Sequence, residues 1–274
     1  MPGWFDSHCH FDFPIFDTDR EPIWQHSQNL GIDGLLLPGV SRQQLERLPA
    51  LVAHKPWYFA AGLHPYFLDQ HQADDLDWLA DWLVVQQAVQ QTGQQTAGQV
   101  SKLVAVGECG LHQLRQASDE QARQQLQLFE AQVTLAREHN LPLVLHGVGT
   151  HDQIVATLRR LRCHTGGVIH GFSGSEQQAR RYLDAGIRIG VGATFFHARA
   201  TRLRRTLSAL PADAFLLETD SPDMTAPFWA SSCHSPQTIP LIGVGLSSLL
   251  KCSPEQLRIQ LRHNLYATFS ALKS

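Results

Sequence analysis

The chain of 274 residues has few lysines, no paired cysteines and no long apolar run. Its five cysteines are widely spread without a C-x-x-C pair, which argues against a disulfide framework and against a thiolate zinc site. No apolar run approaches the about 18 residues of a membrane span, and no secretory signal pattern opens the chain. The formal charge of −3 argues against a protein held on nucleic acid by bulk positive charge. We therefore expect a protein of a reducing compartment such as the bacterial cytoplasm, with no membrane partner.

Short apolar runs alternate with longer amphipathic stretches along the whole chain. Hydrophobic residues make up 43% of it, which is enough for a core. Amphipathic periodicity predicts helices over Asp119–His139 and Thr150–Leu161. Eight short strands, each followed by a helical stretch, favour an α/β fold of the (β/α)8 TIM-barrel type over a sandwich or a bundle. The predicted strands are Trp4–Cys9, Gly34–Leu37, Tyr58–Leu63, Leu103–Gly107, Leu143–His146, Gly167–His170, Arg188–Val191 and Phe215–Glu218.

The segment 86–99 differs in composition from the rest of the chain, because seven of its residues are glutamine. It lies between a helical stretch and the fourth predicted strand. We expect an extended helix end or a mobile loop there, inserted into a single domain that spans residues 1–274, and we assign no chemistry to it.

Histidines and carboxylates close several of the predicted strands. In (β/α)8 barrels, active sites form at the C-terminal ends of the strands. His8 and His10 are two residues apart in an extended segment, so both side chains point to one side, as a chelating pair requires. The C-terminal ends of other predicted strands offer further nitrogen or carboxylate ligands on the same side of the barrel. These residues are His64, Glu108, His146, His170 and Asp220.

This donor set suits two divalent metal ions. Without His64, the four imidazoles and two carboxylates already exceed what one catalytic zinc ion binds. A carboxylate such as Glu108 can bridge two ions, and the mixture of nitrogen and oxygen suits Zn, Mn, Co or Ni and tolerates Mg. Such ions lower the pKa of a bound water, whose proton Asp220 can accept. The pattern therefore predicts a metal-dependent hydrolase with Glu108 and Asp220 as catalytic residues.

Not all of the fifteen histidines are expected to bind metal. Six are expected at the surface or in packing, namely His26, His54, His71, His139, His164 and His263. Four more fall on loops after predicted strands and stay undecided, namely His112, His151, His197 and His234. Among the arginines after the seventh predicted strand, Arg199 is the best placed to contact a phosphate.

The chain resembles the TatD family of metal-dependent deoxyribonucleases, within the amidohydrolase-like barrels. The resemblance covers nearly the whole sequence in seven ordered blocks. These are DSHCH at Asp6–His10, AAGLHP at Ala60–Pro65, VAVGECGLH at Val104–His112, LPLVLH at Leu141–His146, GVIHGFSGS at Gly167–Ser175, GVGATFF at Gly190–Phe196 and LLETDSPDM at Leu216–Met224.

The resemblance implies a role for each predicted ligand. It implies that one metal ion is bound by His8, His10 and Asp220. It further implies that His146 and His170 bind the other ion, with Glu108 between the two and His64 near the substrate phosphate. The implied reaction is hydrolysis of a phosphodiester bond at an end of a DNA strand, typically single-stranded. A small phosphoester is the other implied substrate, and the oligomeric state stays open, with a monomer as one candidate.

Two positions depart from the family pattern. His112 stands where the family usually has Asp, and Val148 stands where many members have an Arg that can contact phosphate. The absence of a guanidinium weakens the case for a nuclease and leaves the metal site intact.

Two alternatives to a nuclease are therefore considered. The first is an amidohydrolase or phosphotriesterase-like hydrolase of a small ester, lactone or amide. Many such barrels bridge their metals with a carbamylated lysine, but none of the four lysines ends a strand here, and Glu108 occupies that place. The second is a non-catalytic metal-binding barrel, which does not explain why Asp220 stands beside five other ligands.

Overall fold

The computed structural model describes residues 1–92, 101–113, 118–230 and 233–273. The chain divides into two compact units. Unit 1 contains Met1–Leu37, His170–Leu183 and Arg188–Ser274, and unit 2 contains Pro38–Ile169 and Asp184–Ile187. The expectation of a single domain over residues 1–274 stays a prediction.

All eight predicted strands are present, and they follow the order of the chain in the sheet, β1 to β8. Helices alternate with the strands, so the fold is an α/β fold of the (β/α)8 barrel class, as the sequence predicts. The strands are β1 (Trp4–Asp6), β2 (Ile32–Pro38), β3 (Trp57–Ala61), β4 (Leu103–His112), β5 (Leu143–Val148), β6 (Gly167–Ile169), β7 (Ile187–Val191) and β8 (Phe215–Leu217).

The helices also follow the predicted pattern. The two helices expected over Asp119–His139 and Thr150–Leu161 are observed as α5 and α6. The α-helices are α1 (Arg20–Asn29), α2 (Arg42–Leu45), α3 (Leu48–Val52), α4 (Asp75–Thr92), α5 (Asp119–Glu138), α6 (His151–Arg160), α7 (Glu176–Asp184), α8 (Thr201–Ser208), α9 (Ile239–Leu250) and α10 (Pro254–Thr268). Two 3-10 turns near predicted site residues are η2 (Pro65–Gln70) and η3 (Ala193–Phe196).

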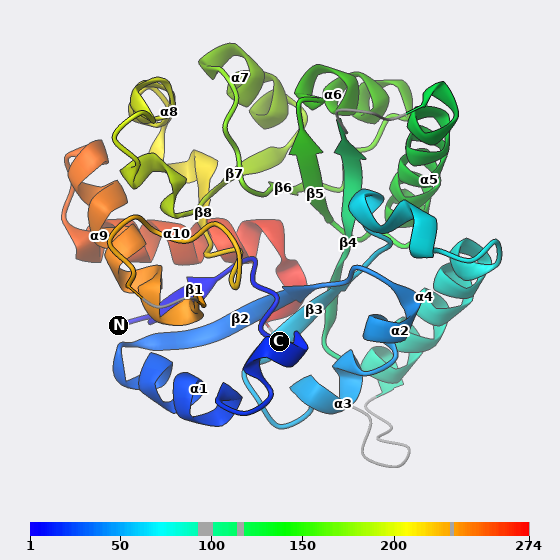
Figure 1. Cartoon of the computed structure of the whole chain (residues 1–274), viewed down its shortest axis with the longest axis horizontal. Helices are drawn as coiled ribbons and strands as arrows, with labels where there is room; N and C mark the ends of the chain where they lie inside the picture. Colours follow the sequence, from blue (N-terminus) through cyan, green and yellow to red (C-terminus); the bar gives the residue numbers. More distant parts are fainter. Residues whose placement is uncertain (93–100, 114–117, 231–232, 274) are drawn as a thin grey trace. The chain divides into compact units, whose positions relative to one another are not determined.

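Unit 2 contains β3 to β6, which pair in parallel and lie beside α5 and α6 in Figure 1. The residues Leu103–Val106 of β4 are buried, as a sheet covered on both faces requires. Phe129 and Val133 are buried on the face of α5 that packs against β4. A capping box formed by Ser118 and Gln121 begins this helix and satisfies its first backbone N–H groups.

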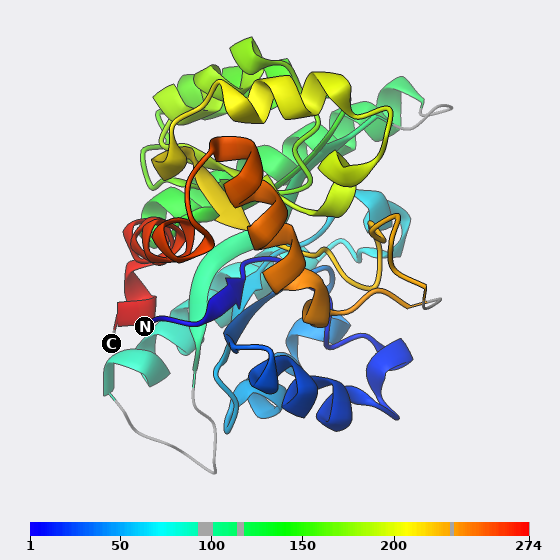
Figure 2. The same cartoon turned by 90° about the vertical axis from the view of Figure 1, so that its left-hand side faces the viewer.

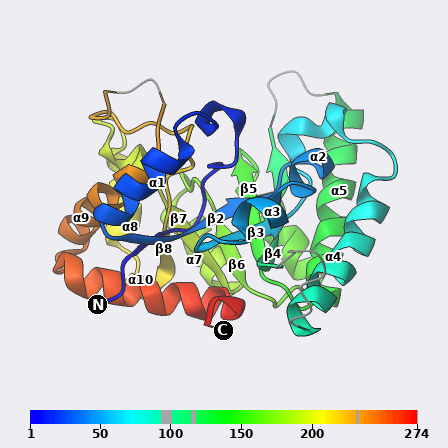
Figure 3. The same ribbon diagram turned by 90° about the horizontal axis from the view of Figure 1, so that it is seen from below.

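Unit 1 contains the pairs β1–β2 and β7–β8. Helix α9 packs against β1 and β8 and lies across β8 in Figure 2. Helix α10 runs beside the N-terminal segment, as Figure 3 shows. Arg262 of α10 donates to the Gly3 carbonyl at 3.1 Å and forms an ion pair with Asp33. These contacts tie the first strands of the unit to its last helix.

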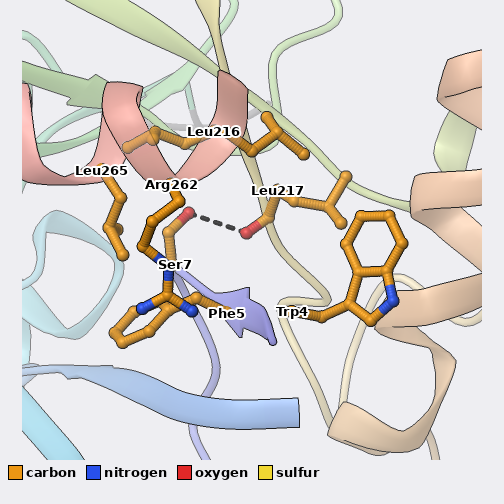
Figure 4. A pocket seen from close by; sticks show the side chains of 8 residues that line it. Trp4, Phe5, Ser7, Leu216, Leu217, Arg262 and Leu265 are labelled. Carbon is orange, nitrogen blue, oxygen red and sulfur yellow. Dashed lines mark hydrogen bonds between the residues drawn. The ribbon is translucent and has the colours of Figure 1, made fainter. Parts of the chain in front are cut away.

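A small cavity lies among β1, β8 and α10 in unit 1 (Figure 4). Its volume is about 20 Å³, and its lining is mostly apolar, with Trp4, Leu216 and Leu265 among the residues. Ser7 Oγ donates to the Leu217 carbonyl at 2.9 Å at its edge. A cavity of this size holds roughly one water molecule, so it is not a substrate pocket.

Two further expectations concern α4 and the membrane. Residues 86–92 of the glutamine-rich segment form the end of α4, as the helical alternative predicts, and residues 93–99 lie outside the described residues. Within the described part of the chain, no helix has the length and apolar character needed to cross a membrane.

Candidate metal centre and active site

The segments that follow β1 and β8 bring three predicted ligands together in unit 1. His8 Nε2 lies 3.4 Å from Asp220 Oδ1, and His10 Nε2 lies 3.7 Å from the same oxygen. All three residues are buried, and one ligand atom from each lies within 4.8 Å of the others. Two ligands about 2.1 Å from a tetrahedral ion lie roughly 3.4 Å apart. The donor set therefore fits a divalent cation.

His170 belongs to this cluster and follows β6 directly. Its ring stacks on His8 with centroids 4.0 Å apart, and its Nδ1 lies 4.0 Å from Asp220 Oδ1. Burial alone would raise the pKa of Asp220, but the neighbouring imidazoles His170, His8 and His10 lower it to about 2. An ionised carboxylate among imidazoles is suited to bind a cation.

Backbone hydrogen bonds join the segment that carries Asp220 to the histidine pair. The Asp220 N–H donates to the His8 carbonyl at 2.8 Å, and the His10 N–H donates to the Ser221 carbonyl at 2.7 Å. Asp220 has a φ of 57°, in the left-handed region that non-glycine residues rarely adopt. Such a conformation persists where the surrounding contacts over-determine it, and it is common at functional sites.

Asp6 supports this cluster and was not among the predicted site residues. It is fully buried and accepts hydrogen bonds from the Thr219 N–H at 3.0 Å, the Thr219 hydroxyl at 2.7 Å and the His8 N–H at 3.3 Å. Burial raises the pKa of Asp6 to about 7, against the lowering effect of these hydrogen bonds. Its place at the start of the D-x-H-x-H block was the signal in the sequence.

Glu218 is a second buried acid that the sequence analysis missed. Its Oε1 accepts the Gly171 N–H at 2.6 Å, so it ties β8 to the segment that carries His170. Burial raises the pKa of Glu218 to about 8, opposed by the charge of His8 and by the Gly171 hydrogen bond. A Cβ at Gly190 would lie 2.2 Å from Glu218 Oε2, so only glycine leaves room for this carboxylate.

Unit 2 carries a second cluster, formed by His64, Glu108 and His146. Glu108 Oε1 lies 3.0 Å from His64 Nε2 and 2.9 Å from His146 Nδ1. All three residues are buried, and one ligand atom from each lies within 4.8 Å of the others. Imidazole nitrogen and carboxylate oxygen are again the donors that a divalent cation of the predicted kind binds.

Glu108 is not at the end of its strand, which corrects the prediction. The apolar run stops at Gly107, but β4 continues to His112. The pairing of β4 with β5 shifts register between Gly107 and Cys109, so Glu108 occupies an irregular position within the strand. Such irregularities re-aim a side chain and are common next to active sites.

Hydrogen bonding indicates that His64 orients Glu108 and does not bind metal. His64 Nδ1 accepts the Tyr66 N–H at 3.0 Å. A neutral ring whose Nδ1 accepts carries its hydrogen on Nε2, so Nε2 donates to Glu108. A nitrogen that carries hydrogen has no lone pair for a cation. The predicted contact of His64 with a substrate phosphate stays a prediction.

His112 is the last residue of β4, not part of a loop after it, and it contacts the second cluster. Its Nδ1 lies 2.9 Å from His146 Nε2, and the two rings are stacked at an angle of 11°. Its backbone N–H donates to Gln125 Oε1 at 2.9 Å. Burial, and then the charge of His146, lowers the pKa of His112, which favours the neutral form of this ring.

Arg20 of α1 holds the segment after β1, and no local pattern in the sequence marks it. Its guanidinium donates to the carbonyls of Phe11 at 2.8 Å and Phe13 at 3.0 Å, and it forms an ion pair with Asp17 at 2.7 Å. The ring of Phe13 stacks on His10 with centroids 4.6 Å apart. Arg20 thus restrains the side of the cluster that carries His10.

The remaining predictions have different outcomes. Arg199 lies on an exposed turn between η3 and α8, and its substrate role stays a prediction. His234 is buried and its Nε2 lies 2.7 Å from Thr238 Oγ1, which indicates a structural role. The assignment of His146 and His170 to one ion joins residues of the two units and stays a prediction.

The barrel fold and the two clusters of imidazole and carboxylate donors define a class of protein, the metal-dependent hydrolases of the (β/α)8 type. A family model described as TatD related DNase matches residues 5–270. The chain belongs to this family, as the sequence blocks indicate, and it is a metal-dependent hydrolase.

Three relatives illustrate the similarity. An uncharacterized metal-dependent hydrolase, YjjV, of Escherichia coli K12 is 35% identical over 266 residues, which cover 97% of each chain. A protein of Pantoea ananatis named 3'-5' ssDNA/RNA exonuclease TatD is 31% identical and covers 98% of this chain and 100% of its own. The crystal structure of Escherichia coli YjjV, a TatD homolog, superposes with a TM-score of 0.86 at 34% identity, over 97% of this chain and 98% of that one.

Proposed function

We propose that the protein is a binuclear metal-dependent phosphodiesterase that acts on the ends of DNA strands with a metal-activated water. The observation that carries the proposal is the ionised Asp220 carboxylate, 3.4 Å from His8 and 3.7 Å from His10. Relatives that are named 3'-5' ssDNA/RNA exonucleases support a single-stranded nucleic acid as the substrate.

Each unit contributes donors for one of the two proposed cations. In unit 1 the donors are His8, His10 and Asp220, and in unit 2 they are Glu108 and His146. The family pattern also assigns His170 to the second cation and shares Glu108 between both. The donor chemistry admits Zn, Mn, Co, Ni or Mg.

The residues of the chain divide the chemical work. Bound divalent cations supply Lewis acidity, which acidifies water and polarises a phosphoryl oxygen. Asp220 stays ionised at neutral pH, so it can take the proton of the attacking water. Glu108 is held by His64, so its carboxylate keeps one orientation. Arg199, on its exposed turn, is the proposed contact for a substrate phosphate.

One observation favours a second candidate, a hydrolase of a small ester, lactone or amide. Val148, at the position where many family members have a phosphate-binding arginine, is an apolar side chain that is 44% exposed. An exposed valine offers no hydrogen bond to a phosphate, and it suits a less charged substrate better.

The test is a screen of metals against substrates. Chelator-treated protein is supplied with Mn, Mg, Zn, Co or Ni and incubated with end-labelled single-stranded DNA, a small phosphodiester, lactones and amides. We expect shortening of the DNA from an end, its loss in Asp220→Ala, and its retention in Asp223→Ala, a matched change at an exposed carboxylate three residues away. Intact DNA together with cleaved lactone or amide would favour the second candidate.

We also propose a location in the cytoplasm. All five cysteines are free, and three of them are buried. Thiols that do not pair are typical of a reducing compartment. Cell fractionation with an antibody against the full chain tests this proposal.

A further inference from the structure

We propose that His112 is a positioning residue for cation binding in unit 2. Its Nδ1 accepts a hydrogen bond from His146 Nε2 when His146 binds a cation through Nδ1. This inference rests on the proposed function, because it assumes a cation beside Glu108 and His146. The contact that carries it is the 2.9 Å distance between His112 Nδ1 and His146 Nε2.

The contacts of His146 determine which nitrogen carries its hydrogen without a cation. Glu108 is a carboxylate and only accepts, so His146 Nδ1, at 2.9 Å, carries a hydrogen and donates it. The neutral ring then accepts at Nε2, and His112 Nδ1 donates to it. The hydrogen bonds run from His112 to His146 and from His146 to Glu108.

Cation binding at His146 Nδ1 requires the opposite arrangement. The Nδ1 hydrogen leaves to solvent, and the hydrogen between the two rings passes from His112 Nδ1 to His146 Nε2. His112, which is partly exposed, regains a hydrogen from water on its Nε2, so the number of protons bound by the two rings is unchanged. His112 can do this because an imidazole both donates and accepts, whereas a carboxylate in its place only accepts.

The surroundings of His112 hold it in position for this exchange. Its backbone lies in β4 and pairs with Val148 of β5, two residues after His146. Its backbone N–H is bound by Gln125 of α5, and the ring of Tyr66 lies 5.3 Å away. Partners that hold a ligating histidine by its second nitrogen typically change metal affinity about 10- to 100-fold.

The experiment uses the full chain in three variants. His112→Phe keeps a ring of similar shape and removes both nitrogens, whereas His112→Asn keeps an oxygen acceptor near the position of Nδ1. The matched control is His139→Phe, which removes another half-buried imidazole of unit 2, whose Nδ1 lies 2.7 Å from Gln87 Oε1. Mn²⁺ is titrated into chelator-treated protein by calorimetry, and the ring nitrogens are followed by ¹⁵N NMR with Zn²⁺. Thermal unfolding verifies that each variant is folded.

The expected results distinguish this inference from the proposed function. Wild type and His139→Phe bind two cations, whereas His112→Phe binds one of them about 10- to 100-fold more weakly and His112→Asn remains within roughly threefold of wild type. In the wild type, NMR shows the His146 hydrogen on Nδ1 without metal and on Nε2 with Zn²⁺. Unchanged binding of both cations by folded His112→Phe would overturn the inference. Fewer than two cations on the wild type would instead contradict the proposed function.

Discussion

The two histidine–carboxylate clusters use the same residue types at different spacings. In unit 1, the imidazoles lie 3.4 to 4.0 Å from Asp220 Oδ1. In unit 2, the imidazoles lie 2.9 to 3.0 Å from Glu108 Oε1. The first spacing is close to that of ligands around one tetrahedral ion, roughly 3.4 Å, and the second is that of hydrogen bonds.

By these spacings the unit 1 cluster fits a cation as it stands, whereas the unit 2 cluster is held together by hydrogen bonds. Unit 1 concentrates negative charge on Asp220, whose pKa is lowered to about 2 by the neighbouring imidazoles against the effect of burial. In unit 2, Glu108 accepts hydrogen bonds from His64 and His146, and His146 is in turn hydrogen-bonded to His112. A cation must therefore displace a hydrogen from His146 in unit 2, so we expect weaker binding there than in unit 1.

Removing the charge in unit 1 should have the largest effect. We expect Asp220→Asn to lower kcat/KM for hydrolysis on the order of 10³-fold, because the cation ligand and the proton acceptor are lost together. Initial rates on end-labelled single-stranded DNA measure this, with Asp223→Asn as the control. Wild-type activity in a folded Asp220→Asn variant would show that Asp220 takes no part in the reaction. It would also contradict the proposed difference between the two clusters.

Removing the charge in unit 2 should have the next largest effect. In Glu108→Gln the carbonyl oxygen can still accept from His64 Nε2–H and His146 Nδ1–H, but the negative charge is lost and the second oxygen becomes an NH2 group that cannot bind a cation. We expect hydrolysis to fall about 10²- to 10³-fold and one cation to be lost in calorimetric titration. The affinity for the remaining cation then tells whether Glu108 also contributes to the cluster in unit 1. A value equal to that of the wild type would assign Glu108 to unit 2 alone, and two cations bound as in wild type would contradict the role of Glu108.

The orienting residue His64 should matter less than the carboxylate that it holds. We expect His64→Gln to weaken cation binding in unit 2 about 10- to 100-fold, because Glu108 loses a fixed donor. Binding in unit 1 should change little. His54→Gln, at an exposed position of the same unit, is the control. If His64→Gln binds both cations as wild type does, the hydrogen-bond arrangement does not govern affinity and the contrast between the clusters loses its basis.

The sequence predicted the strands and the ligand candidates well for a physical reason. Parallel strands buried on both faces are short apolar runs, as in Leu103–Gly107, and such runs stand out in any sequence. The H-x-H spacing marked His8 and His10 as a pair, although β1 ends at Asp6 and both histidines lie in the segment that follows it. The prediction was wrong where a strand continues beyond its apolar run, as β4 does to His112. Glycines at 107 and 110 resemble a turn, and only pairing with β5 shows otherwise.

The burial of the two acids was not predicted, because the groups that satisfy them lie far away in the chain, and the only signal was the place of Asp6 at the start of the D-x-H-x-H block. Asp6 is satisfied by Thr219, and Glu218 by Gly171. No residue near either acid in the sequence identifies these donors, and an isolated carboxylate is expected at the surface. Arg20 also could not be predicted, because apart from Asp17 its partners are backbone carbonyls that any sequence would offer.

The buried acid Glu218 gives the smallest and most local prediction. A Cβ at position 190 would lie 2.2 Å from Glu218 Oε2 and 2.8 Å from its Cδ, whereas a Cβ at position 192 would meet the same side chain at an ordinary 3.6 Å. We expect Gly190→Ala to lower the free energy of unfolding by about 1–3 kcal/mol, because the carboxylate must move away from the Gly171 N–H. Gly192→Ala should stay within about 0.5 kcal/mol of wild type.

Urea unfolding of the metal-free proteins measures the free energy of unfolding of both alanine variants. Comparing the two separates the contact of the new Cβ with Glu218 from a general effect of alanine near the end of β7. The displaced Glu218 also bears on the comparison of the clusters, since its Gly171 contact adjoins His170 of unit 1. Gly190→Ala should therefore weaken the unit 1 cation and leave the unit 2 cation unchanged. Equal stability of the two alanine variants would mean that Glu218 relaxes freely and does not hold the unit 1 cluster.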